Sequence, residues 1–296
     1  MTLAAIIVTF NSEVCIDPLL DSVAQAGVDE IVVVDNGSTD ATVARVLQHK
    51  GVRLVRSMNV GYAGGINQGV RAVPDARAYL VLNPDLVIKP GAAEALAAAL
   101  EEPGVGITVP VVLTSDGRRQ DSLRREPTLL RAIGLNGTGV PRFSEYVRGD
   151  DAYNKPRDVD WALGAAVMFS RVCYEAVGPW DESFFLYSEE TDFCLRARDA
   201  GWRTRFVPQA VVVHHEGGSG RSDATHQMLI LNKVRLYARR HGRVASWAYW
   251  VATVLSEASW VLRGHPESRA AIRALMRPVE RPPELRMDTG ILPKDF

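Results

Sequence analysis

The sequence has few cysteines, no net excess of charge and no long hydrophobic run. Its 3 cysteines among 296 residues are an odd number without metal-ligand spacing, which argues against a disulfide framework and a zinc ribbon. The formal net charge of -1 lacks the basic excess of nucleic-acid-binding proteins, so we expect no nucleic-acid partner. The first apolar run ends at Asn11 and follows no basic segment, which predicts a buried strand rather than a signal peptide. These absences favour a reducing, cytoplasmic location.

The near-zero net charge conceals an uneven distribution of charge along the chain. Residues 1–220 carry 21 basic and 28 acidic residues, a net charge of -7, whereas residues 221–277 carry 10 and 3, a net charge of +7. The last stretch, 278–296, has a net charge of -1. This division predicts a catalytic body followed by a basic segment that has an anionic partner.

Short runs of β-branched residues alternate with stretches of helical spacing over the first hundred residues. Strands are expected at 5–10, 31–34, 52–55 and 78–82, and helices at 18–24 and 42–47. Such alternation predicts βαβ units, so the expected fold class is α/β, with a Rossmann-like, mostly parallel sheet flanked by helices. Ligands bind such sheets at the carboxyl ends of the strands.

Polar residues follow each of these expected strands. Asp35 and Asn36 come after the second strand, and a carboxylate there can accept an N–H from a pyrimidine base, although Ser38 could equally cap the next helix. The stretch 59–69 is dense in glycine and opens a helix, which suits a diphosphate. Asp85 follows the fourth strand and offers a hard oxygen ligand for Mg²⁺ or Mn²⁺.

The second half of the chain holds an acidic cluster among aromatic residues, 180–193. A carboxylate there can have its pKa raised by desolvation and accept a proton near neutral pH. The same acids would also complement the dipole of a helix expected at 190–200, in which Asp192 can pair with Arg196. A histidine pair, His214 and His215, ends the apolar run 207–213 and could ligate a metal or hold a phosphate.

Taken in order, these motifs resemble the inverting glycosyltransferases of family 2, which have the GT-A fold, and in particular bacterial rhamnosyltransferases that use dTDP-rhamnose. The likeness spans roughly residues 3–221. It is carried by eight segments: 7–11, 33–38, 59–67, 82–85, 164–166, 178–185, 189–192 and 215–219.

The resemblance implies a role for each motif. It implies that Asp85 fills the metal position of the family's D-x-D motif, in which Asn83 replaces the first Asp, and that His215 is a further metal ligand. Glu190 would be the general base, with Glu189 as the alternative, and Mg²⁺ or Mn²⁺ the cofactor. The nucleotide-sugar site would comprise Thr9, Asn11, Asp35, Asn36, Asn59, Gly64, Gly65, Asn67 and Asn83. The acceptor site would comprise Trp161, Gly164, Ala165, Trp180, Asp181 and Arg221.

The expected reaction is inverting transfer of a sugar from a dTDP- or UDP-linked donor, first of all L-rhamnose from dTDP-rhamnose. The expected acceptor is a saccharide linked to a polyprenyl diphosphate, in bacterial cell-envelope polysaccharide synthesis. Galactofuranose and other sugars remain open as the transferred group. A nucleotide-sugar pyrophosphorylase would have a glycine-rich, basic loop after the first strand. This chain has Thr9-Phe10-Asn11-Ser12-Glu13 there, with no glycine and no basic residue, which argues against that class of enzyme. A catalytically degenerate, membrane-bound scaffold is the non-enzymatic alternative, because Asn83 and Glu190 replace aspartates.

The expected organisation is a GT-A catalytic domain at 1–220, with a nucleotide-sugar half at about 1–113 and an acceptor half at about 114–220. A basic amphipathic helical arm, 221–277, and an extended tail, 278–296, follow. The arm includes a tryptophan-rich helix at 244–262, in which Glu257 and flanking arginines argue against a membrane span. Its tryptophans, with Arg239, Arg240 and Arg243, favour peripheral attachment to the anionic inner face of the plasma membrane. A homodimer interface is the alternative.

Overall fold

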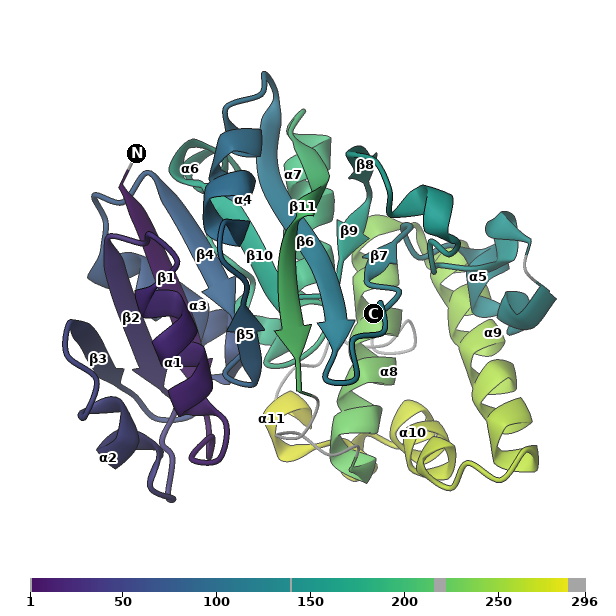
Figure 1. Ribbon diagram of the computed structural model, residues 1–296. Helices are drawn as coiled ribbons and strands as arrows, with labels where there is room; N and C mark the ends of the chain where they lie inside the picture. Colours follow the sequence, from purple (N-terminus) through teal and green to yellow (C-terminus); the bar gives the residue numbers. More distant parts are fainter. Residues whose placement is uncertain (1, 139, 216–221, 287–296) are drawn as a thin grey trace.

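The computed structural model describes residues 2–138, 140–215 and 222–286. At its centre lies a nine-stranded sheet of order β3-β2-β1-β4-β10-β6-β11-β5, with β8 paired to β11 (Figure 1). The strands of this sheet are β1 Leu3–Thr9, β2 Glu30–Asp35, β3 Val52–Arg56, β4 Ala78–Leu82, β5 Leu86–Ile88, β6 Val105–Thr114, β8 Arg157–Val159, β10 Ala166–Ser170 and β11 Arg203–His214. A separate ribbon pairs β7 Leu123–Arg124 with β9 Trp161–Ala162.

The predicted mostly parallel sheet is confirmed. Strands β1 to β4 run parallel, and β6 and β11 point the same way because β10 is antiparallel to both β4 and β6. Only β5, β8 and β10 among these strands run in the opposite direction. The carboxyl ends of β1, β2, β4, β6 and β11 therefore meet at one edge of the sheet, which positions the residues that follow them.

Helices cover both faces of the sheet (Figure 1). One core cluster joins the sheet to α1, α2 and α4, and another joins its opposite face to α3, α6 and α7. The buried residues of α1 fall at helical spacing, Ile16, Leu19, Leu20 and Val23, so one apolar stripe faces the sheet. These helices are α1 Ile16–Ala24, α2 Thr42–Val46, α3 Gly61–Ala72, α4 Ala92–Leu100, α6 Arg171–Val177 and α7 Glu189–Asp199.

The C-terminal arm is a helical cluster with its own apolar core, packed against the catalytic body. Its helices are α8 Asp223–Arg240, α9 Arg243–Leu262 and α10 Glu267–Met276, and the short α5 Leu129–Ala132 of the body lies against α9. The helix expected at 244–262 is confirmed as α9. No helix among residues 2–138, 140–215 and 222–286 is long and apolar enough to cross a membrane.

The tail is not extended where the structure describes it. Residues 278–280 form a 3₁₀ turn and α11 spans Pro283–Arg286, each beginning with a proline. Proline suits the first position of a helix because its fixed φ matches and its missing N–H would be unpaired there. Leu285 is completely buried in the core of the arm. The expectation of an extended tail is therefore wrong for 278–286, and 287–296 lie outside the described residues.

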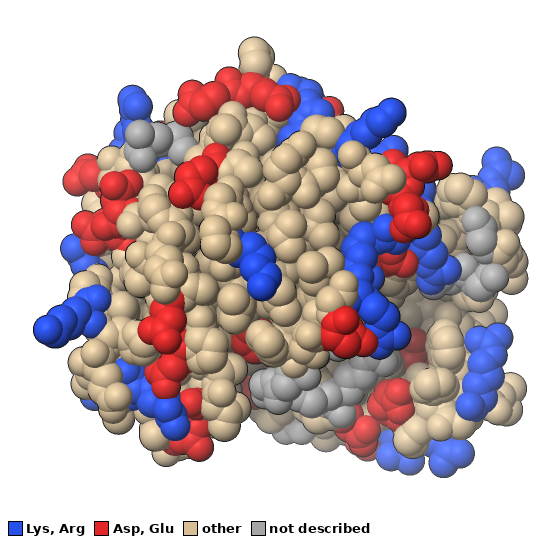
Figure 2. Space-filling model, viewed as in Figure 1, with Lys and Arg blue, Asp and Glu red and all other residues tan. Residues whose placement is uncertain are grey.

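The arginines of the arm are paired with the catalytic body. Arg239 forms an ion pair with Asp181, and Arg240 pairs with Asp199 at 2.6 Å. Arg235 is buried and donates to the backbone of Ser183. On the face shown in Figure 2, Lys and Arg side chains lie among Asp and Glu side chains. The membrane contact expected of Arg239 and Arg240 stays a prediction, and in the structure both side chains are paired with carboxylates of the body.

Candidate active site

Asp35 ends β2 beside Thr9, which ends β1. The hydroxyl of Thr9 donates to Asp35 Oδ1 at 3.2 Å, and the Ser38 backbone N–H donates to Oδ2 at 3.1 Å. Asn11 has a positive φ of 52° and accepts the Thr39 backbone N–H through its side chain. The three predicted base-binding residues, Thr9, Asn11 and Asp35, therefore lie together at the carboxyl edge.

Asn36 and Asn59 both hold the beginning of α3. The Asn36 amide donates to the Gly61 carbonyl at 2.9 Å, and the Asn59 side chain accepts the Gly61 backbone N–H at 3.1 Å. Gly61 has a φ of +79°, and a Cβ there would collide with the backbone of Phe185. These contacts fix the position of the helix that faces the predicted diphosphate.

Gly64, Gly65 and Asn67 are buried in α3. A Cβ on Gly65 would come within 2.6 Å of the Val8 side chain, so Gly65 lets α3 approach β1 closely, whereas a Cβ on Gly64 would meet the side chain of Val60. Asn67 is completely buried and its amide exchanges hydrogen bonds with the backbone of Trp180. The contact of these residues with the sugar stays a prediction, and in the structure Gly65 packs on the sheet and Asn67 on the Trp180 backbone.

Asp85 lies in the loop between β4 and β5, next to the end of β11. Its Oδ1 is 3.2 Å from His214 Nε2, and both side chains are largely buried. His215 is exposed, and only its backbone N–H contacts Asp85, through the carbonyl. The side chain beside the carboxylate is therefore that of His214, the last residue of β11, and not that of the predicted His215, which lies just beyond the strand.

Asp85 and His214 form a small set of candidate metal ligands. Within the described part of the chain, no group of three or more His, Cys, Asp or Glu side chains could hold a metal ion. His214 Nδ1 is buried without a hydrogen-bond partner, and a carboxylate with an imidazole suits Mn²⁺. The two residues fit a cation whose remaining ligands come from phosphate and water.

Tyr62 lies between the carboxyl edge of the sheet, where the donor is predicted to bind (the donor edge), and the acidic pair Glu189 and Glu190. The sequence analysis did not predict a role for it. Its hydroxyl donates to Asn83 Oδ1 at 2.7 Å and lies 3.5 Å from the Gly164 carbonyl. Burial, followed by the charges of Glu189 and Glu190, raises the pKa of Tyr62 well above its ordinary value, so the hydroxyl stays protonated. An aromatic residue inside the glycine-dense stretch was the available signal.

Glu189 and Glu190 begin α7 and are both buried. Burial raises the pKa of Glu190 to about 7, and burial together with the charge of Glu190 raises the pKa of Glu189. Each has one carboxylate oxygen, Oε2, without a hydrogen-bond partner. Such a carboxyl group can accept a proton near neutral pH. The predicted pair of Asp192 with Arg196 is confirmed at 2.6 Å.

The turn before this pair has an unusual backbone that the arm holds in place. Phe185, Tyr187 and Ser188 all have φ between 58° and 73°, a conformation that costs non-glycine residues free energy. The amide of Asn232, completely buried in α8, donates to the carbonyls of Phe184, Leu186 and Tyr187 at 2.6–3.2 Å. The arm therefore fixes the turn that carries the two glutamates.

A cavity of about 490 Å³ lies between the catalytic body and α8, and Glu190 lines it. Glu189 is not among its lining residues. The body contributes aromatic, basic and acidic side chains, with Asp121 and Glu145 as the acids, and α8 contributes Lys233 on an otherwise apolar wall. The residues that define these walls are Arg124, Arg131, Tyr146, Trp161, Leu163, Leu229, Ile230, Lys233 and Leu236.

The predicted acceptor residues divide between this cavity and the core. Trp161 lines the cavity, and a Cβ on Gly164 would lie 3.3 Å from the Glu190 side chain. Trp180 is buried and stacks on Phe193 with ring centroids 4.7 Å apart, so its side chain does not reach a ligand here. The expectation for Trp180 is wrong for this reason.

Three further acceptor predictions have other outcomes. Ala165 is buried, and its carbonyl accepts the Asn83 backbone N–H at 2.8 Å. Asp181 accepts from Ser183 at 2.9 Å and pairs with Arg239, so it secures the acidic turn. Arg221 lies outside the described residues.

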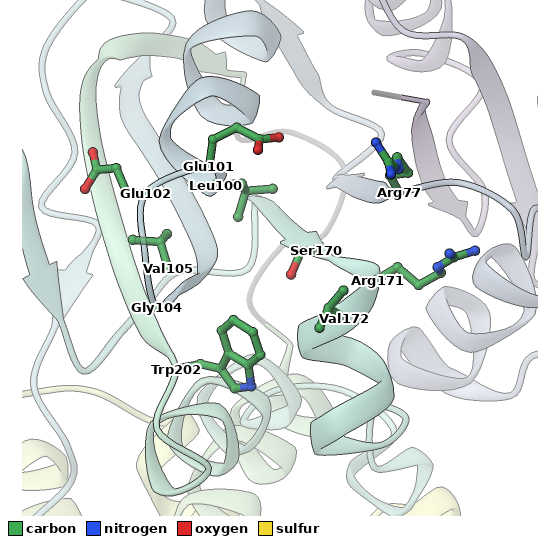
Figure 3. A pocket seen from close by; sticks show the side chains of 10 residues that line it. All are labelled: Arg77, Leu100, Glu101, Glu102, Gly104, Val105, Ser170, Arg171, Val172 and Trp202. Carbon is green, nitrogen blue, oxygen red and sulfur yellow. The ribbon is translucent and has the colours of Figure 1, made fainter.

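A second cavity, of about 420 Å³, lies at the opposite edge of the sheet (Figure 3). It is lined by residues where β6 begins and β10 ends, among them Val105, Ser170 and Trp202. None of the predicted site residues lines it. The candidate active site is therefore the carboxyl edge together with the cavity at Glu190.

Comparison with known proteins agrees with this geometry. The profile described as "Glycosyl transferase family 2" matches residues 4–158, and "Glycosyl transferase family group 2" matches 149–275. An N-acetylglucosaminyl-diphospho-decaprenol L-rhamnosyltransferase of Mycobacterium tuberculosis is 31% identical over 79% of this chain and 80% of its own length. The chain belongs to glycosyl transferase family 2. Rhamnosyltransferase WbbL of Escherichia coli is 24% identical over 73% of this chain and 84% of its own.

A solved structure supports the same fold for this family 2 glycosyltransferase. Mannosyltransferase PcManGT from Pyrobaculum calidifontis, in complex with GDP-Man and Mn²⁺, superimposes with a TM-score of 0.56. It is 18% identical and covers 96% of this chain and 83% of its own. The predicted GT-A fold is confirmed, and a protein of this fold binds a nucleotide sugar with a divalent metal. The chain is thus an enzyme, a rhamnosyltransferase-like glycosyltransferase.

Proposed function

We propose that this protein transfers L-rhamnose from dTDP-rhamnose to a saccharide linked to a polyprenyl diphosphate, in cell-envelope polysaccharide synthesis. The observation that carries the proposal is Glu190, a buried carboxylate at the wall of a cavity that adjoins the carboxyl edge. The printed name of the Mycobacterium relative supports the lipid-linked acceptor and the sugar.

The residues of the site suit an inverting displacement. The acceptor hydroxyl attacks the anomeric carbon from the face opposite the nucleotide, and its oxygen forms the new glycosidic bond. The bond from that carbon to the diphosphate oxygen breaks, and the nucleoside diphosphate leaves with the electron pair. Glu190 accepts the hydroxyl proton, for which a pKa near 7 is suited. Thr9, Asn11 and Asp35 hold the base of the donor.

Asp85 and His214 would hold Mg²⁺ or Mn²⁺ together with the donor diphosphate. When bound, such a cation offsets the negative charge that develops on the leaving group. Tyr62 fixes the side chain of Asn83 beside this site, through the hydrogen bond of 2.7 Å. The amide nitrogen of Asn83 then faces away from Tyr62 and is available to donate to a sugar or phosphate oxygen.

We further propose that the enzyme attaches peripherally to the inner face of the plasma membrane. On α9, Val244, Trp247, Val251 and Leu255 recur at helical spacing and are all exposed. Such an apolar stripe suits the headgroup boundary of a bilayer. Arg243 and Arg263 flank it, and neither forms an ion pair with a described Asp or Glu. A homodimer through the same stripe is the alternative outcome.

The direct test is transfer with purified protein. We expect rhamnose to move from dTDP-rhamnose to N-acetylglucosaminyl-diphospho-decaprenol in the presence of Mg²⁺ or Mn²⁺, with inversion visible in the anomeric NMR signal of the product. UDP-galactofuranose serves as the competing donor. Transfer from that donor alone would reject rhamnose, and an unchanged rate in Glu190→Gln would reject the assignment of the base.

A further inference from the structure

Two hollows lie on either side of the short helix α5. Pro127 and Arg131 line the cavity that contains Glu190. Leu129 and Ile133 line a separate groove of about 460 Å³, whose other wall is α9. The chain segment 127–133 therefore borders both hollows. A ligand that passes over this segment would have one part beside the catalytic carboxylate and another part in the groove.

The cavity holds two arginines without an acidic partner. Neither Arg124 nor Arg131 forms an ion pair with a described Asp or Glu, whereas Lys233 in the same cavity pairs with Glu145 at 2.7 Å. Arg124 is only 7% exposed, and its guanidinium lies 3.9 Å from the centre of the Tyr146 ring. Arg131 Nε is buried without a hydrogen-bond partner. Their present partners are backbone carbonyls: Arg124 donates to those of Asp121 and Leu123, and the half-buried Arg131 donates to that of Glu126. A guanidinium group has five N–H donors in a planar fork that matches the geometry of phosphate oxygens, so donors remain for an anionic ligand.

The groove on the other side of α5 is apolar along its whole length. Its lining residues are Leu129, Ile133, Trp247, Ala248, Val251, Ala252 and Leu255. Leu255 is 64% exposed and Val251 is 45% exposed, although both are fully apolar. Contiguous apolar surface of this kind marks a site for a lipid or a partner. Because the segment 127–133 borders both this groove and the cavity with the two arginines, the pair of hollows favours an amphiphilic ligand that has one charged end.

We propose that Arg124 and Arg131 bind the diphosphate of the lipid acceptor and that the α5–α9 groove receives the first part of its polyprenyl chain. This inference rests on the proposed function, because it names the path of that acceptor. The order of the features matches the order of the ligand: Glu190 beside the sugar, the two arginines beside the diphosphate, and the apolar groove beside the chain. Trp247, Val251 and Leu255 belong both to the groove and to the exposed stripe of α9, so the groove opens on the surface proposed to meet the membrane.

The test measures binding without any transfer of sugar. Farnesyl diphosphate is titrated calorimetrically into the full-length protein in saturating dTDP and Mg²⁺, which keep the donor site filled. Farnesol and inorganic diphosphate are the two partial probes. We expect farnesyl diphosphate to bind at least about 10-fold more tightly than either partial probe, because only it fills both hollows.

Two variants separate the two parts of the path. Arg131→Gln should weaken farnesyl diphosphate about 10-fold and leave farnesol within about 2-fold, since one charge-assisted contact is lost. Leu255→Asp should weaken farnesyl diphosphate and farnesol alike and leave inorganic diphosphate unchanged. The matched controls are Arg77→Gln and Val172→Asp, at the cavity of Figure 3, where Val172 is 60% exposed. Both controls should bind all three probes as the wild type does.

Several results would overturn the proposal. One is equal affinity of the wild type for farnesyl diphosphate and for inorganic diphosphate. Another is the same affinity for each probe in the two variants as in their controls. A wild-type dimer that Leu255→Asp separates, with farnesyl diphosphate binding unaffected, would show that the groove is an interface between two copies. The binding test contains no donor sugar and is therefore independent of the transfer assay. Tight binding of farnesyl diphosphate in the first, together with no rhamnosyl transfer in the second, would reject the proposed function and leave the lipid site standing.

Discussion

The donor edge and the acceptor cavity are built in different ways. The donor edge consists of residues that directly follow parallel strands, such as Asp35 after β2 and Asp85 after β4. The acceptor cavity joins the loop before α5, the turn before α7 and the face of α8, which lie far apart in the sequence. The first site therefore depends on the topology of the sheet, whereas the second depends on docking of the arm.

The largest effect on turnover should come from replacing Glu190, the proposed base in the acceptor cavity. Glu190→Gln should lower kcat by at least about a hundredfold at nearly unchanged donor affinity, because proton removal is lost and donor contacts remain. The wild-type rate should rise with pH and level off above about 7, since Glu190 must be deprotonated to act. Steady-state kinetics over a pH series measures both quantities.

Glu189→Gln is the matched control for this prediction. Glu189 precedes Glu190 in the same helix and does not line the cavity, so its variant should lose much less turnover. A larger loss in Glu189→Gln than in Glu190→Gln would move the role of base to Glu189.

Asp85→Ala should weaken binding at the proposed donor edge and leave binding at the proposed acceptor cavity unchanged. We expect at least about a tenfold loss of Mn²⁺-dependent affinity for the nucleotide-sugar donor, because a metal loses a carboxylate ligand. Calorimetry with and without Mn²⁺ measures the loss, and farnesyl diphosphate binding should stay the same. His215→Ala, which changes an exposed side chain, is the control for His214→Ala. Unchanged donor affinity in Asp85→Ala would remove this residue from the site.

Asn232→Asp should show that the arm positions the base. The aspartate has the same shape and cannot donate to the three carbonyls of the turn, so we expect kcat to fall about tenfold with KM for the donor unchanged. Gln227→Glu is the control on the same helix, because Gln227 donates only to Ala270 in α10 at 3.3 Å. A fall in donor affinity equal to the fall in kcat would indicate general unfolding instead.

The smallest expected effect concerns stability. The folded pKa of Glu190 is raised, so the folded state holds this proton more tightly than the unfolded state does. Its contribution to stability is fully present below about pH 4.5, the ordinary pKa of Glu, and declines as pH rises to about 7. Glu190→Gln removes this dependence, so its Tm should exceed that of the wild type by roughly 2 °C or more at pH 8 and by less at pH 5. Equal Tm values at both pH values would contradict a raised pKa.

The sheet and the donor edge were predictable because their pattern is local. β-branched runs separated by helical spacing identified β1 to β4, and the residues after them met at one edge as parallel strands require. Asp85 was found in this way, whereas Glu190 was found from the acidic cluster 180–193 and from the resemblance to the family. The choice between His214 and His215 depended on the pairing of β11 with β5, which places His214 opposite Leu86 and so next to Asp85.

The rest depended on contacts across long sequence separations. Asn67 looked like a ligand residue in a glycine-dense stretch, but its partner is the Trp180 backbone, which no local pattern indicates. Arg239 and Arg240 formed a basic run, and only the docked arm shows that Asp181 and Asp199 neutralise them. Asn232 had no sequence signal at all, since its function depends on three carbonyls of a distant turn.

The hold of Asn232 on the turn has a consequence for how the enzyme comes into being during synthesis. A ribosome releases the sheet and the two glutamates before it releases α8, since the chain is made from its N-terminus. Until residue 232 has emerged and docked, Phe185, Tyr187 and Ser188 lack the amide that offsets their unfavourable backbone conformation. A nascent or truncated chain thus has the elements of the proposed donor site but no fixed turn to carry the proposed base, so competence for transfer would arrive with the last third of the protein.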